Sequence, residues 1–78
     1  MVKVYTYQIG TGVGSEIHAL EHSQTISASD LPGAIKIAGE ITRSKVWRPD
    51  SNLVCLLEEL GEDCHLMWFR PIEVARDA

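Results

Sequence analysis

The stretch SDLPGAIKIAGEITR, residues 29–43, carries the strongest periodic signal in the chain. Asp30 or Ser29 can accept hydrogen bonds from the first free N–H groups of a helix, and Pro32 suits a first turn. On a wheel of about 100° per residue, the apolar side chains share one arc of roughly 160°. These residues are Leu31, Ala34, Ile35, Ile37, Ala38 and Ile41. The pattern predicts an amphipathic helix whose apolar face needs a partner surface, and a sheet built from the flanking segments can supply it.

The segment before the helix alternates between apolar and polar residues in the manner of strands. Residues 1–9 predict a first strand, and residues 23–28 predict a second strand antiparallel to it. The GTGVG segment, residues 10–14, is interpreted as a wide hairpin turn and not as a phosphate loop, because no Lys-Ser/Thr pair follows it. Residues 15–21 fit either a short helical turn or an irregular arm.

The segment after the helix predicts a loop and a second hairpin. Residues 44–51 contain turn-forming residues, and they are followed by a strand at 52–58, a turn at 59–63 around Gly61, and a strand at 64–70. Pro71 is expected to end regular pairing or to confine it to an edge. Ile72 and Val74 are expected to cover an edge, and residues 75–78 are expected to fray. The order ββαββ predicts a single α+β domain over residues 1–78, a two-layer fold with a four-stranded antiparallel sheet and one helix on one face.

This second hairpin is apolar on both faces. The third strand alternates Leu53, Cys55 and Leu57 with Val54 and Leu56, and the fourth alternates Leu66 and Trp68 with Met67 and Phe69. A single helix covers one side only, and a free side of an antiparallel sheet is normally polar. Two explanations remain open. Either the arm at residues 16–20 or the C-terminal tail folds over the second side, or another chain does so, as a self-dimer or as a protein partner.

Composition restricts the classes of function. The chain has 78 residues and a net charge of −4, which argues against nucleic-acid binding over its whole surface. No run approaches the roughly 20 apolar residues of a membrane span, and residues 1–8 lack the core of a signal peptide. We therefore expect a cytoplasmic protein with no membrane association.

Histidines and cysteines are the candidates for metal or catalytic chemistry. His18 and His22 have the i, i+4 spacing of a zinc-binding pair on a helix, the alternative being exposed loop side chains. Cys64 and His65 are neighbours and point to opposite faces of a strand, so they neither chelate together nor form a nucleophile pair. A Cys55–Cys64 disulfide fails on register, because Cys64 should face Glu59 and Cys55 should face Trp68. We expect no enzyme activity, no cofactor and no metal.

Charged side chains form two groups, each of which is either ordinary solvated surface or a binding site. The first group is acidic and surrounds the second hairpin turn, where it could dock onto basic residues of a nucleic-acid-binding protein. The second group is basic and contains a tryptophan, so it could hold a phosphate backbone. The acidic group is Glu58, Glu59, Glu62 and Asp63, and the basic group is Lys36, Arg43, Lys45, Trp47 and Arg48.

The strand that ends in ISASDL and the AIKIAGEI helix after it place small and aliphatic residues at Ile26, Ala28, Leu31, Ala34, Ile35 and Ala38. Over residues 25–69 this arrangement resembles small phage-encoded anti-CRISPR proteins that act on type I surveillance complexes. The resemblance is one of architecture and transfers no functional residue. It implies stoichiometric binding to a Cas subunit in the host cytosol, without turnover. The DLPG tetrapeptide, residues 30–33, is similar to HicB-type antitoxins, although there a strand follows it and here a helix does.

The sequence therefore predicts a non-enzymatic binding module that inhibits a larger complex by occupying its surface. The alternative is a small dimeric regulatory or antitoxin-like protein that contacts nucleic acid through a local basic patch.

Overall fold

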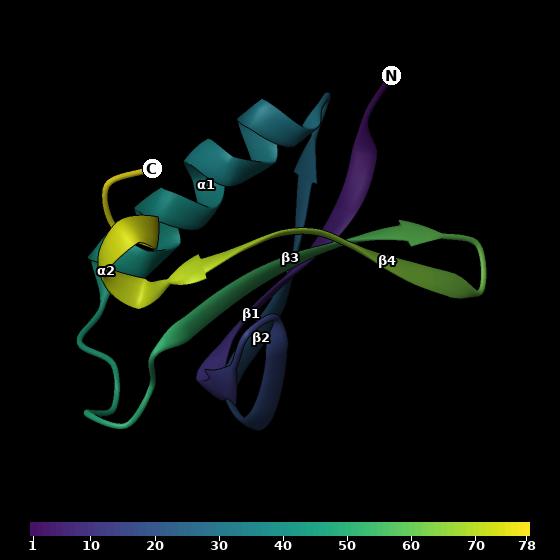
Figure 1. Ribbon diagram of the computed structural model, residues 1–78. Coiled ribbons are helices and arrows are strands. Elements are labelled where there is room, and N and C mark those ends of the chain that lie inside the picture. Colours follow the sequence, from purple (N-terminus) through teal and green to yellow (C-terminus); the bar gives the residue numbers. More distant parts are fainter.

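Four antiparallel strands form one sheet in the order β2-β1-β3-β4 in the computed structural model, which describes all residues from Met1 to Ala78 (Figure 1). One long helix packs on one face of the sheet, which confirms the predicted α+β architecture. Strands β2 and β4 are the two edges. The elements are β1 (Lys3–Val13), β2 (Glu16–Ala28), α1 (Leu31–Ser44), β3 (Leu53–Leu60), β4 (Asp63–Pro71) and α2 (Ile72–Ala75).

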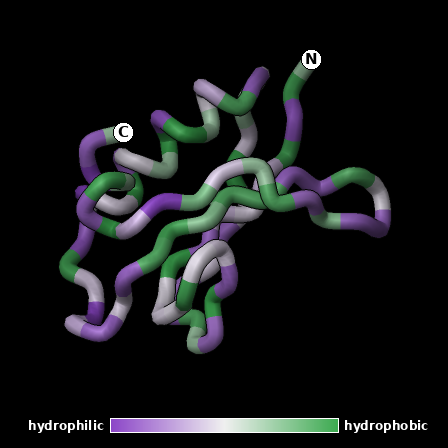
Figure 2. Tube along the Cα trace, viewed as in Figure 1, coloured by the Kyte–Doolittle hydropathy of each residue, from purple (hydrophilic) through white to green (hydrophobic).

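Helix α1 begins where the sequence places it. The Gly33 N–H group donates to Asp30 Oδ1 at 2.9 Å, so Asp30 is the N-cap, and Pro32 lies in the first turn. Hydrophobic and hydrophilic residues are interspersed along the helix (Figure 2). Small residues form the line of closest approach to the core, with Ala34 and Ala38 fully buried. The larger aliphatic residues, including Ile35 and Ile41, are half-buried along its flanks.

The first hairpin is longer than its sequence pattern predicts. Strand β1 continues through the expected turn to Val13, and β2 begins at Glu16, so residues 15–21 are mostly strand and not a helical turn or an irregular arm. The turn itself is at Gly14, whose φ is 64°. Register shifts after Ile9 and after Thr11 bend the hairpin, and a side chain at Gly12 would collide with a β2 carbonyl oxygen. Gly10 and Gly12 therefore allow β1 and β2 to approach closely inside a bent hairpin.

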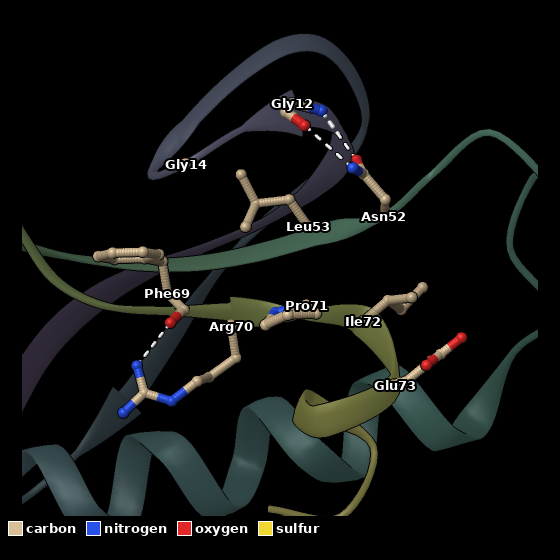
Figure 3. Close-up of a pocket in the computed structure, with 9 residues that line it drawn as sticks. All are labelled: Gly12, Gly14, Asn52, Leu53, Phe69, Arg70, Pro71, Ile72 and Glu73. Atoms are coloured by element: carbon tan, nitrogen blue, oxygen red, sulfur yellow. Dashed lines mark hydrogen bonds between the residues drawn. The ribbon is translucent and has the colours of Figure 1, made fainter.

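We call residues 12–17 the β1–β2 tip and the sheet face away from α1 the outer face. The Asn52 side chain holds the tip in place. Its Nδ2 group donates to the Gly12 carbonyl at 3.0 Å, and the Gly12 N–H donates to Asn52 Oδ1 at 2.9 Å (Figure 3). The tip lies against Leu53, and Cys55 Sγ is 3.7 Å from the Ser15 carbonyl oxygen. These contacts bury Leu53 and Cys55 on the outer face of β3.

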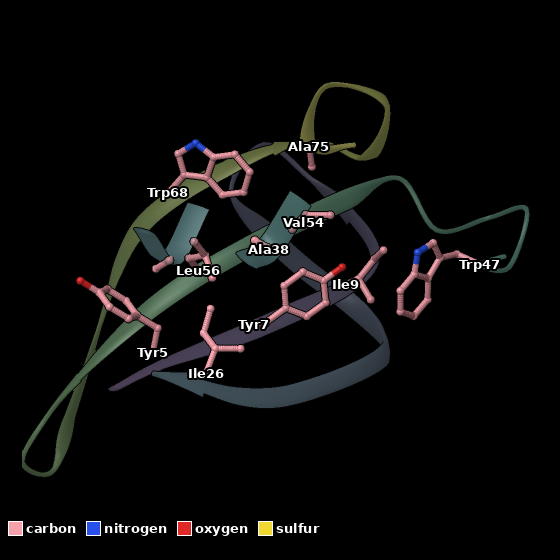
Figure 4. Packing of buried hydrophobic residues seen from close by; sticks show 11 residues of the cluster. Tyr5, Tyr7, Ile9, Ile26, Ala38, Trp47, Val54, Leu56, Trp68 and Ala75 are labelled. Carbon is pink, nitrogen blue, oxygen red and sulfur yellow. The ribbon is translucent and has the colours of Figure 1, made fainter. Parts of the chain in front are cut away.

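The hydrophobic core lies between the sheet and α1 (Figure 4). Tyr5, Tyr7 and Ile9 share the face that the alternation predicted, and all three are buried. The Tyr7 and Thr42 hydroxyls are 2.8 Å apart, and Thr42 donates onward to the Ala38 carbonyl at 2.7 Å. Thr42, the one hydroxyl on the apolar side of α1, is therefore fully satisfied. Burial raises the pKa of Tyr7, the Thr42 hydrogen bond offsets part of the rise, and the nearby Glu21 carboxylate adds to it.

The C-terminal segment is ordered against α1, which contradicts the expected fraying of residues 75–78. Residues 72–75 form the short helix α2, and Ala75 is fully buried in the core. Arg43 Nη1 donates to the backbone oxygens of Arg76 at 2.7 Å and Ala78 at 3.0 Å. Gly39 leaves room for this segment, because a Cβ at Gly39 would lie 2.5 Å from the Ala78 oxygen. The close approach at Gly39 is thus made by the C-terminal segment.

Candidate functional site

The β3–β4 hairpin extends beyond the area that α1 covers (Figure 1). Along β4 every residue is exposed except Trp68, although the strand is rich in apolar side chains. Leu66 and Met67 are each 41% exposed, and Phe69 is 39% exposed. Leu60, at the end of β3, is also exposed. Exposed apolar residues concentrated on one edge strand are typical of an interaction surface.

A β-bulge at Met67 decides which β4 residues share a face. Leu57 pairs with Leu66 while Leu56 pairs with Trp68, so Met67 is the extra residue. Trp68 therefore lies on the helix side, and Leu66 and Phe69 lie on the outer face. Strict alternation predicted Leu66 and Trp68 on one face, and that prediction is wrong because of the bulge. The expected Cys64–Glu59 pairing is confirmed, but Cys55 pairs with Phe69 and not with Trp68.

The outer face is only partly covered by the chain itself. The β1–β2 tip shields β3, as one of the two explanations from sequence allowed, but β4 stays open. A groove of about 600 Å³ separates the tip from the end of β4. Leu53 and Phe69 line it, with Arg70 and Glu73 on the side of β4 and α2 (Figure 3). The Asn52 side chain, which also lines the groove, makes two hydrogen bonds to the Gly12 backbone.

Three of the four predicted acidic residues gather at the exposed hairpin turn. Glu59, Glu62 and Asp63 are exposed around Gly61, whose φ is 67°. We call these three the acidic tip. Glu58 differs because its side chain lies on the helix side of the sheet. It forms an ion pair with Lys3 at 3.5 Å, and only 7% of the residue is exposed. The acidic tip adjoins the exposed apolar residues of β4, whereas Glu58 belongs to the body of the fold.

The predicted basic group does not form one continuous site. Trp47 is 8% exposed, and its Nε1–H donates to the Thr42 carbonyl at 2.9 Å, so its ring packs in the core and does not present a face for base stacking. Lys45 Nζ lies 5.6 Å from the centre of that ring. Arg43 is bound to the C-terminal segment. Lys36 and Arg48 are exposed, and the Arg48 backbone N–H donates to the Glu21 carboxylate at 3.0 Å.

The thiol and imidazole groups are also apart from one another. Both cysteines are free, Cys55 being buried and Cys64 exposed, and burial raises the pKa of the Cys55 thiol. His22 lies on β2, where its Nε2 is 2.8 Å from Gln24 Oε1 and its ring faces Trp47 at 5.8 Å between centroids. His18 is exposed on the same strand. No three His, Cys, Asp or Glu side chains cluster in a way that could hold a metal ion.

Sequence reasoning selected charges as the site and left the exposed apolar residues of β4 out of it. The sequence does contain a signal for this surface, because the strand at residues 64–70 has apolar residues on both of its faces. Arg70 was also missed. Its guanidinium carbon lies 5.5 Å from the centre of the Trp68 ring.

Comparison with protein-family models, with curated proteins and with solved structures finds no match for this chain. Neither helix of the structure has the length and apolar character needed to cross a membrane.

Proposed function

We propose that this chain is a non-enzymatic binding module that inhibits or regulates a larger protein by occupying part of its surface. The observation that carries the proposal is the β3–β4 hairpin, which combines exposed apolar residues with an adjacent acidic tip. Leu66, Met67 and Phe69 supply apolar contact area, and the apolar core of an interface supplies most of its binding energy. The acidic tip supplies charge complementarity to a basic surface, which favours rapid and specific association.

The rest of the chain supports binding more than catalysis. Burial raises the pKa of the Cys55 thiol, and the exposed thiol, Cys64, lies opposite Glu59 across the hairpin. A nucleophile needs a base within hydrogen-bonding reach, and no hydrogen bond joins either thiol to a histidine.

A phage-encoded inhibitor of a type I surveillance complex is the specific form of this proposal that the sequence resemblance suggests. Such complexes handle nucleic acid with basic surfaces, and an acidic tip on a projecting hairpin is complementary to a surface of that kind. In this form the chain acts stoichiometrically and needs no cofactor. The nucleic-acid-binding alternative is less well supported, because the predicted stacking residue Trp47 is buried and Arg43 is engaged within the chain.

The test uses purified type I surveillance complex and measures both co-elution with the chain and the binding of target DNA by the complex. A Glu59→Lys/Glu62→Lys variant reverses two charges of the acidic tip. A Glu16→Lys/Glu40→Lys variant makes the same charge change at exposed positions on β2 and α1. We expect the native chain and the control to co-elute and to reduce DNA binding, and the acidic-tip variant to lose both effects. Failure of the native chain to bind rejects the anti-CRISPR form. Equal binding by the two variants removes the acidic tip from the interface.

A further inference from the structure

We infer that a second copy of this chain pairs with the free edge of β4, antiparallel to it, with Asp63 opposite Arg70 of the partner subunit. The two sheets then join into one continuous sheet across a two-fold axis perpendicular to it. This inference goes beyond the proposed function and does not depend on it. The second copy pairs with the backbone edge of β4, and Leu66 and Phe69 stay on the outer face of the joined sheet, where a larger protein can still contact them. It rests on the distribution of charge, of apolar residues and of side-chain direction along β4.

Charge along β4 is self-complementary. Asp63 is the first residue of the strand and Arg70 is the last but one, and both residues are exposed. Antiparallel pairing about a two-fold axis between Leu66 and Met67 brings each acidic end against a basic end. The contact occurs twice, because a two-fold interface repeats every pair. Opposite charges directly across a strand pair stabilise the pairing, and like charges oppose it.

The β-bulge is what allows this register. Paired residues on neighbouring strands must lie on the same face of the sheet. Asp63 pairs with Leu60 and His65 with Glu58, which places both on the helix side. Beyond the bulge, Arg70 pairs with Val54 and is on the helix side as well. Without the extra residue at Met67, position 70 would lie on the opposite face from position 63, and the two charges could not meet.

The same register gathers the exposed apolar residues at the two-fold axis. Leu66 lies opposite Met67 of the partner subunit, and Cys64 lies opposite Phe69 of the partner subunit. The two bulges meet at the centre, and the regular segments on each side pair with each other. The other edge is less apolar: β2 exposes one large aliphatic side chain, Leu20, and its exposed residues between Ser23 and Ser27 are polar. Glu59 lies on β3, one strand away from the joined edges, so the dimer leaves it accessible.

The first experiment measures molar mass in solution over a range of concentrations. The native chain should pass from 8.7 kDa to twice that mass as concentration rises. Asp63→Arg and Arg70→Asp should each weaken dimerisation at least about tenfold, about 1.4 kcal/mol, because each turns two attractive pairs into two repulsive ones. The Asp63→Arg/Arg70→Asp double variant should recover it, and Glu59→Arg should leave it unchanged. A chain that stays at 8.7 kDa at millimolar concentration, or a double variant that is no better than the singles, overturns the inference.

The second experiment tests the register by oxidative crosslinking in a Cys55→Ala background, which is needed because Cys55 lies opposite position 69 within the chain. A Phe69→Cys change puts the new thiol opposite Cys64 of the partner subunit, within disulfide reach. An Arg70→Cys change puts it on the other face. We expect a covalent dimer from the first variant and none from the second. Equal crosslinking of the two variants overturns the register.

Discussion

Removing the Asn52 side chain should release the β1–β2 tip from the outer face. The Asn52→Ala change deletes two hydrogen bonds, at 3.0 Å and 2.9 Å, between this amide and the backbone of Gly12. A hydrogen bond contributes about 0.5–1.5 kcal/mol, so the loss is about 2 kcal/mol in the free energy of opening the tip. Because the tip covers Cys55, opening becomes visible as reaction of that thiol. A loss of about 2 kcal/mol corresponds to roughly 30-fold faster modification.

The assay follows reaction of Cys55 with a disulfide reagent in a Cys64→Ser background, since Cys64 is exposed and would react directly. An Asn52→Asp variant keeps the acceptor for the Gly12 N–H and loses the donor to the Gly12 carbonyl, so an intermediate rate is expected. A Ser44→Ala variant, which removes an exposed hydrogen bond at the end of α1, serves as the control. If Asn52→Ala leaves the Cys55 rate at the native value, the tip does not depend on this amide and the argument for self-cover of β3 fails.

Three further predictions concern the core and the C-terminal segment. Because burial raises the pKa of Tyr7 above its usual 10.0, the unfolded chain releases this proton first. The free energy of unfolding should therefore be unaffected below about pH 10 and should fall as pH rises through the folded-state pKa of Tyr7. Urea titrations over this pH range should show a smaller fall for Tyr7→Phe. An equal fall in the variant would contradict a raised pKa at Tyr7. Trp47→Phe should cost about 2–3 kcal/mol in urea unfolding, because the Thr42 carbonyl loses its donor and the smaller ring leaves a gap, whereas a cost below about 0.5 kcal/mol would place the ring outside the core. Gly39→Ala should displace residues 76–78 and make them susceptible to protease, and in a chain lacking those residues the same change should stabilise by about 1 kcal/mol through helix propensity; a native-like protease pattern would refute the contact.

The helix was the most predictable element because its signals are local. The cap, the first-turn proline and the 3.6-residue period lie within residues 29–43, and α1 follows them from Leu31 to Ser44. The second hairpin was predicted for the same reason, since both strands and the Gly61 turn are contiguous.

The errors arose where distant residues decide the local structure. Glycines at 10 and 12 suggested a turn, but they serve close strand approach in a hairpin that Asn52 holds in a bent shape from 40 residues away. Trp47 was grouped with neighbouring cations because nothing local shows that its indole N–H finds the Thr42 carbonyl. The bulge at Met67 likewise cannot be recognised from the pattern of apolar residues. It places Leu66 and Trp68 on opposite faces of the sheet, where strict alternation predicted one shared face. A polar residue such as Asn52 directly before an apolar strand is the kind of signal that could indicate such a hydrogen bond.

The central claim is that the chain shields the outer face of β3 by itself and leaves the edge of β4 for another chain. Residue-resolved amide hydrogen exchange tests it most directly, first on the dilute chain and then after assembly with a second copy or a protein partner. We predict that β1 and β3 amides are protected throughout, and that the edge-facing amides of residues 63–70 exchange quickly when dilute and slowly when assembled. Edge amides of β4 that are already protected in the dilute chain, or that stay unprotected in every assembly, would contradict the claim.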